Sequence, residues 1–249
     1  MSEEKDKREM NIPLFQIVDT SDKLVKPKTK IFDMPFRIAV VGKSGSGKTS
    51  VLVQLLASPF FYGNDFQGEN IYIVSGSLTN DEKLQRLIKY KNIPEENLFP
   101  AYNDGEINVL YEFLENEFKT LRKEGKKPPH NVILFDDVSY AGNLAKKFGA
   151  MSRLVCNCRK ISVSLVILSQ YFKHLSPVVR QNVNGAIIFH QSNSQVDAIS
   201  EDFNYADSKK IFRKTFHDVT AKPHGFFVIN ETNPRNEWYS DSFQRYLDI

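Results

Sequence analysis

Residues 42–49 combine glycines, a lysine and a hydroxyl residue at a spacing that is typical of phosphate binding. The segment reads GKSGSGKT and fits the pattern G-x-x-x-x-G-K-[ST]. Its glycines let successive backbone N–H groups turn toward anionic oxygens at the positive end of a following helix. We expect Lys48 to reach the β- and γ-phosphates of a nucleoside triphosphate and Thr49 to offer its hydroxyl to Mg²⁺. The predicted nucleotide-binding residues are Gly42, Lys43, Ser44, Gly45, Ser46, Gly47, Lys48, Thr49 and Ser50.

A pair of carboxylates follows an apolar strand pattern further along the chain. Residues 132–135 read VILF and lead directly into Asp136 and Asp137. A buried parallel strand presents its last residues at the carboxyl edge of the sheet, where ligands bind in such folds. We therefore assign Asp136 to Mg²⁺, through water, and Asp137 to polarising the attacking water. The alternative is an acidic turn that caps the next helix.

Three further polar side chains are candidates for the same reaction. The strand predicted at 163–168 leads into Gln170, which could sense the γ-phosphate or hold the water, or could be a strand-terminal polar residue without a role. Arg159 precedes this strand and Arg180 follows it. A guanidinium that reached a neighbouring subunit's γ-phosphate would supply charge that stabilises the transition state. Each arginine could instead bind DNA or a local carboxylate.

A sheet must bring these side chains together, and the hydrophobic pattern predicts one. Apolar runs alternate with segments of helical periodicity, which implies parallel βαβ units and one three-layer α/β domain. Strands are predicted over 38–41, 70–75, 132–135, 163–168, 186–190 and 226–229, with the last one closing the fold. Helices are predicted over 48–56, 80–91, 106–123, 145–156 and 207–216.

The remaining segments suggest how the chain is divided. Residues 1–30 are rich in Lys, Asp and Glu and are expected to form a flexible or edge-docked arm, in which residues 15–18 could add a short edge strand. We expect residues 31–249 to form a single domain with a C-terminal extension from about residue 192.

The composition is that of an ordinary folded protein. The chain has 249 residues with 33 Lys+Arg against 30 Asp+Glu, a net charge of +3, and 41% of its residues are hydrophobic. These proportions exclude a disordered or collagen-like chain. No apolar run reaches the length that spans a bilayer, so no integral membrane segment is predicted. Cys156 and Cys158 are too few for a disulfide framework, which favours a reducing compartment.

The charge is unevenly distributed along the chain. No Asp or Glu occurs between Val138 and Val196. Such a stretch favours a polyanionic partner. The alternative is that its cations pair in space with acids from elsewhere. The seven cations are Lys146, Lys147, Arg153, Arg159, Lys160, Lys173 and Arg180.

The order of these parts resembles the genome-packaging ATPases of large double-stranded DNA viruses, the poxvirus-type branch of the HerA–FtsK superfamily. The segments that carry the resemblance are GKSGSGKTS, LFDD, CRKISVSLVILSQ and SPVVRQN, and the similarity covers roughly residues 36–190. It implies a RecA-like P-loop NTPase (ASCE) fold with a mainly parallel sheet. In that sheet the strands at 186–190, 38–41, 163–168, 132–135 and 70–75 are neighbours in this order, with C-terminal strands added.

The same resemblance implies roles and partners. The family's paired acids, strand-terminal glutamine and flanking arginines fall on Asp136, Asp137, Gln170, Arg159 and Arg180. Many pumps of the superfamily carry Glu at the second acidic position, where this chain has Asp. The resemblance implies ATP and Mg²⁺ as ligands, double-stranded DNA as substrate, and a pentameric or hexameric ring. It further implies a capsid vertex or portal protein as partner, in the virion or the host cytoplasm.

Two other classes of function share the phosphate loop. A small-molecule kinase of the nucleoside type needs an acceptor pocket and usually a lid. A binding module could use ATP to switch a protein contact without turnover. DNA-stimulated hydrolysis that falls with added salt favours the motor, whereas phosphate transfer to a nucleoside without DNA favours the kinase.

Overall fold

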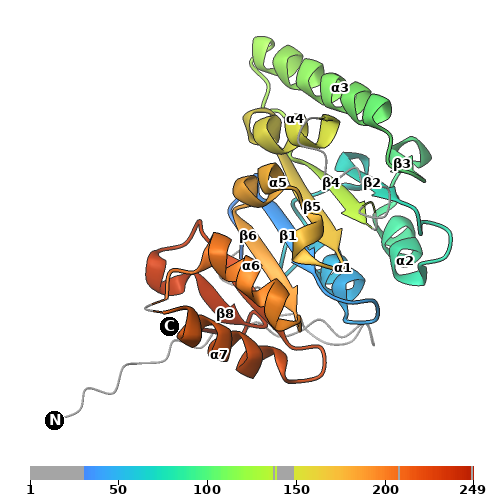
Figure 1. The fold of residues 1–249 in the computed structure, drawn as a ribbon. Coiled ribbons are helices and arrows are strands. Elements are labelled where there is room, and N and C mark those ends of the chain that lie inside the picture. Colours follow the sequence, from blue (N-terminus) through green and yellow to red (C-terminus); the bar gives the residue numbers. More distant parts are fainter. Residues whose placement is uncertain (1–30, 137, 139–148, 207, 248) are drawn as a thin grey trace.

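The computed structural model describes residues 31–136, 138, 149–206, 208–247 and 249 (Figure 1). The predicted N-terminal arm lies outside the described residues. So do Asp137, Lys146 and Lys147, and residues 145–148 at the start of a predicted helix. No helix among the described residues is long and apolar enough to cross a membrane.

In the described part of the chain, one sheet of nine strands forms the centre of the molecule (Figure 1). Its order is β3-β2-β4-β5-β1-β6-β7-β8-β9, so the order implied by the family resemblance is confirmed. The strands from β3 to β6 are parallel, and β7 to β9 continue the sheet antiparallel. The strands are β1 Arg37–Val41, β2 Ile71–Ser75, β3 Leu98–Phe99, β4 Asn131–Asp136, β5 Val163–Ser169, β6 Gly185–Phe189, β7 Phe226–Asn230, β8 Tyr239–Asp241 and β9 Arg245–Tyr246.

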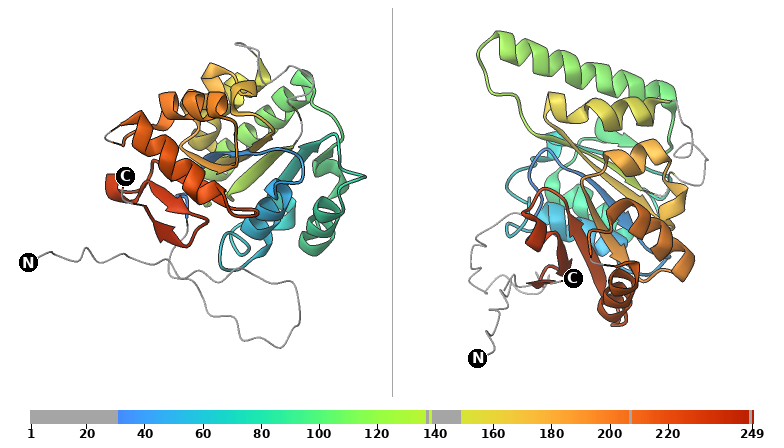
Figure 2. Two further views of the ribbon diagram at one scale, coloured as in Figure 1. Left: turned by 60° about the horizontal axis from the view of Figure 1, so that its bottom comes forward. Right: turned by 60° about the vertical axis from the view of Figure 1, so that its left-hand side comes forward.

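Helices cover both faces of the sheet and make the fold three-layered (Figure 2). One face carries α1 and α2, and the other carries α3 to α7. Successive side chains of β1 point to opposite faces. Ile38 and Val40 therefore pack in the core under α1 and α2, and Ala39 and Val41 pack in the core under α3 to α7. The helices are α1 Lys48–Ala57, α2 Glu82–Lys91, α3 Asp104–Lys123, α4 Ala150–Asn157, α5 Pro177–Asn182, α6 Asn193–Phe203 and α7 Lys209–Thr220.

The central strands form where they were predicted because they are buried on both faces. Every residue of β4 and β5 is buried, and near-continuous apolar runs are the pattern of parallel strands covered on both sides. Helix α3 begins two residues earlier than predicted, since the Asn103 side chain accepts from the backbone N–H groups of Gly105 and Glu106. The helix predicted from 207 begins at Lys209 and continues to Thr220, because Val219 also packs into the core.

Residues 226–229 form a strand as predicted, β7, but the prediction that it is the last strand is wrong. Strand β8 pairs with β7, and β9 pairs with β8. Ser240 and Asp241 of β8 are polar but buried by this pairing, so the segment lacks the apolar signal of a strand. Strand β3 and helices α5 and α6 were not predicted either. The first two are too short for a periodic pattern, and α6 mixes its buried positions with polar residues.

Candidate nucleotide-binding site

The glycine-rich loop leaves the sheet at the end of β1 and turns back into α1. The Gly42 N–H donates to the Ser169 carbonyl at 3.0 Å, which continues the β1–β5 ladder by one residue. Gly45 and Gly47 have φ values of 75° and 112°, in the left-handed region that favours glycine. Gly47 is the residue before the first residue of α1, Lys48. The loop therefore stands at a helix N-terminus, as its sequence predicts.

Lys48 lies across this loop. Its Nζ donates to the carbonyl oxygens of Gly42 at 2.7 Å and Lys43 at 3.0 Å. Lys48 and Thr49 both line a cavity of about 460 Å³, within the range typical of small-molecule sites. Other parts of the loop line the same cavity, and so does the first turn of α2.

Asp136 and Gln170 reach this cavity from the carboxyl edge of the sheet. Asp136 ends β4 and is only 7% exposed. Ser75, its register partner on β2, and Ser77 each donate a hydroxyl to Oδ2 at 3.3 Å. Gln170 follows β5 directly and is half-buried. The Asp136 carboxylate and the Thr49 hydroxyl are oxygen donors of the kind Mg²⁺ prefers, so this edge fits a magnesium ion.

The second acid of the predicted pair, Asp137, is not described by the structure. Its assignment to the attacking water therefore stays a prediction.

Arg159 lies at the opposite edge of the sheet from the cavity. It belongs to a short 3-10 helix, Cys158–Ile161, just before the first residue of β5, and it is exposed. The seven residues of β5 separate it from Gln170, which is a path of roughly 20 Å along the strand. Arg159 therefore does not reach the phosphate loop of its own chain.

Arg180 is engaged by a carboxylate of its own chain. Its Nη1 lies 3.2 Å from Asp202 Oδ2, and its guanidinium stands 5.4 Å from the centre of the Phe172 ring. Burial raises the pKa of Asp202, and the nearby Arg180 partly offsets this shift. Arg180 does not line the cavity. In this structure it matches the local-carboxylate alternative.

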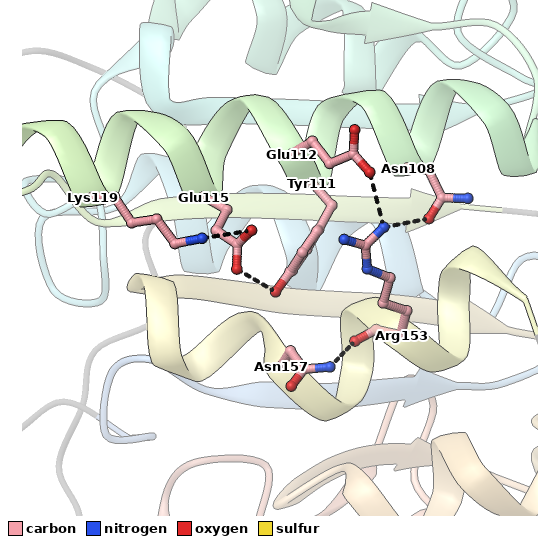
Figure 3. A network of polar contacts seen from close by, with 7 residues as sticks. All are labelled: Asn108, Tyr111, Glu112, Glu115, Lys119, Arg153 and Asn157. Atoms are coloured by element: carbon pink, nitrogen blue, oxygen red, sulfur yellow. Dashed lines mark hydrogen bonds and ion pairs between the residues drawn. The ribbon is translucent and has the colours of Figure 1, made fainter.

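The described cations of the acid-free stretch do not all lie on one surface. Arg153 pairs with Glu112 of α3 at 3.1 Å and lies over the Tyr111 ring (Figure 3). Of the others that are described, Arg159 precedes β5 and Lys173 follows it, so they lie at opposite edges of the sheet. Because Arg153 and Arg180 each form an ion pair with an acid from elsewhere in the chain, the stretch alone does not identify a surface for a polyanion.

Sequence reasoning missed the residues after β2 that also line the cavity. Ser77, residues 80–81 and the first two residues of α2, Glu82 and Lys83, line it, and a usable signal was present. The polar run SGSLTND follows an apolar strand, the same pattern that identified Asp136. His224 was also missed: its Nδ1 lies 2.9 Å from the Ser46 carbonyl oxygen, across 178 residues of chain. No sequence pattern indicates that contact.

A larger cavity of about 890 Å³ lies beside α3 and β3, away from the phosphate loop. Exposed Val109 and Phe113 line it together with glutamates, and none of the predicted site residues reaches it. Its larger volume does not make it the candidate nucleotide site, because its lining contains neither the glycine loop with Lys48 nor the oxygen ligands Thr49 and Asp136.

Comparison with known proteins places the chain in a family. The family described as "Poxvirus A32 protein" matches residues 26–232. Uncharacterized protein 015R of Frog virus 3 is 24% identical over 225 residues, 88% of this chain and 65% of that protein. DNA packaging protein OPG160 of Variola virus is 25% identical over 181 residues, 68% of this chain and 58% of that protein. The chain thus matches less than two thirds of the length of either relative.

Solved structures share the fold. The genome packaging NTPase B204 from Sulfolobus turreted icosahedral virus 2, in complex with AMP, has a TM-score of 0.56 and 16% identity, and covers 86% of this chain and 98% of that one. The same protein in complex with ATP-gammaS has a TM-score of 0.52 and 15% identity, and covers 83% and 95%. The fold is thus that of a P-loop NTPase. Because the family match spans most of the sequence, the chain belongs to the poxvirus A32 protein family.

Proposed function

We propose that the chain is an ATP-hydrolysing DNA translocase that packages double-stranded viral DNA into a preformed capsid. The observation that carries this proposal is the cavity in which the phosphate loop, Asp136 and Gln170 meet. The Variola virus relative is named a DNA packaging protein, and B204 is described as a genome packaging NTPase with AMP or ATP-gammaS bound. These descriptions support the proposal.

The candidate residues, of which Asp137 lies outside the described part of the chain, have separate roles in the proposed hydrolysis. The loop N–H groups and Lys48 bind the β- and γ-phosphates, and Thr49 and Asp136 hold Mg²⁺. When bound, the metal neutralises charge on the phosphate oxygens. Gln170 senses the terminal phosphate or holds the attacking water, and Asp137 polarises that water.

A ring of subunits completes the proposal. Arg159 is exposed and far from the cavity of its own chain, so it can serve only the cavity of a neighbouring subunit. Arg180 would first have to leave Asp202. We propose a pentameric or hexameric ring of single-domain subunits, residues 31–249, with the C-terminal extension from about 192 and the arm 1–30. A capsid vertex or portal protein is the proposed partner, at the assembly site in the virion or host cytoplasm.

Duplex DNA is expected to stimulate ATP hydrolysis by the purified protein in the presence of Mg²⁺. The stimulation should fall steeply between about 50 and 200 mM salt, because contacts with phosphates release bound counterions. A coupled phosphate-release assay at several salt concentrations measures both effects. Fast phosphate transfer to a nucleoside without DNA would contradict the translocase and favour the kinase.

Gly42→Ala is expected to weaken ATP binding by about tenfold or more, which is ~1.4 kcal/mol. An added Cβ would lie 2.5 Å from Ser46 Oγ and 2.9 Å from Phe189 Cβ, so the loop must shift. Gly76→Ala is the matched control, since nothing lies within 4 Å of its added Cβ. Titration with a fluorescent ATP analogue compares the two, and equal affinities would show that loop position does not control binding.

Mixing two inactive variants tests the arginine that acts between subunits. Arg159→Ala and Lys48→Ala subunits should each hydrolyse little ATP alone and recover part of the activity together. Recovery is expected because a mixed ring contains interfaces with one intact loop and one intact arginine. Lys160→Ala, which alters the neighbouring exposed cation, should remain active by itself. Absence of recovery at every mixing ratio would remove Arg159 from this role.

A further inference from the structure

We propose that Lys83 is a second lysine that contacts the phosphates of the bound nucleotide, and that it acts on the terminal phosphate from the start of α2. This inference rests on the proposed function, because it assumes that the cavity binds a nucleoside triphosphate. It assigns a ligand contact to a residue that belongs neither to the glycine loop nor to the acidic pair Asp136 and Asp137.

The start of α2 is held at the cavity by its own cap. The Asp81 carboxylate accepts from the backbone N–H groups of Lys83 at 2.8 Å and Leu84 at 3.2 Å. Leu84 is fully buried in the core beneath α1 and α2. The cap and this packing leave little freedom for the first turn, so the Lys83 backbone has a defined place beside the cavity.

The Lys83 side chain points across the cavity rim to the helix that follows the loop. Its Nζ donates to Ser50 Oγ at 2.6 Å, and Ser50 is the residue after Thr49. An ammonium has three donors, so this contact leaves donors for a further acceptor. Lys83 is exposed, and its side chain lines the same cavity as Lys48 and Thr49.

The acids beside Lys83 in the sequence do not neutralise it. Among the described residues, no carboxylate oxygen lies within 4 Å of its Nζ. The Asp81 side chain caps α2, and Glu82 lies 3.9 Å from Arg86. Lys83 thus follows two acids in the sequence but pairs with neither, and its ammonium contacts a neutral hydroxyl instead.

The residues that line the cavity with Lys83 indicate which phosphate it contacts. Ser77 and the first turn of α2 line the cavity together with Asp136, the proposed metal-side carboxylate, and Ser77 contacts that carboxylate. A Mg²⁺ ion held by Thr49 and Asp136 would neutralise charge at the terminal phosphates, so cations that line the cavity near Asp136 would face the terminal end of the triphosphate. Among the described residues that line the cavity, Lys48 and Lys83 are the cations. Lys83 thus supplies positive charge that neither Arg159 nor Arg180 provides from within the chain.

A purely structural role makes a different prediction. If Lys83 only joined α2 to α1 through Ser50, its loss would affect every nucleotide alike, and Ser50→Ala would have the same effect. A contact with the terminal phosphate affects triphosphates selectively, because ADP lacks that group.

The test compares the affinities of Lys83→Ala for a slowly hydrolysed ATP analogue and for ADP, both with Mg²⁺, by isothermal titration calorimetry. We expect a loss of about tenfold or more for the analogue and less than about threefold for ADP. Lys83→Arg should restore most of the affinity, since it keeps the charge. Lys89→Ala, an exposed lysine later on α2 that does not line the cavity, is the matched control and should bind both ligands as the unaltered protein does.

Equal losses for the two ligands, matched by Ser50→Ala, would overturn the proposal and leave Lys83 with a structural role. Unchanged affinity for both would also overturn it. Neither result contradicts the proposed function. That function would be contradicted separately if the unaltered protein bound neither nucleotide.

Discussion

The proposed binding of a triphosphate by backbone N–H groups is the interaction on which the rest of the proposed site depends. Those groups converge only if the chain between β1 and α1 takes left-handed turns, and Gly45 and Gly47 supply them. The hydrogen bond from Gly42 to Ser169 ties the start of the loop to β5. Close packing of Gly42 against Phe189 ties it to β6. The start of the loop is therefore fixed to the sheet, which positions the amides that follow it before a ligand binds.

The parallel sheet explains why residues far apart in the sequence meet at this loop. Strands β1, β4 and β5 run in one direction, so Gly42, Asp136 and Gln170 all emerge at the same edge. The adjacent end of β2 supplies the serines that hold Asp136. The same geometry places Arg159 at the other edge, which is why a role for it requires a second subunit. Chemistry at one edge and an exposed cation at the other suit a head-to-tail assembly.

The sequence predicts the centre of the fold well because burial on both faces leaves a simple signal. Strands β1, β4 and β5 are apolar runs, and the cavity is lined by the loop after β1, by Asp136 at the end of β4 and by Gln170 after β5. The periphery has no such signal. Strand β8 is buried through pairing although Ser240 and Asp241 are polar. The contacts of Lys83 with Ser50, Arg180 with Asp202 and His224 with Ser46 depend on the folded chain, and sequence spacing does not indicate them.

Hydrogen–deuterium exchange of the loop amides tests the central claim most directly. Addition of a slowly hydrolysed ATP analogue with Mg²⁺ should slow exchange at residues 44–49 by about tenfold or more, because the phosphate oxygens accept hydrogen bonds from these N–H groups. The protection should be lost in Lys48→Ala. Nucleotide binding confirmed by calorimetry without any slowing at these amides would contradict the account, since the phosphates would then be held elsewhere.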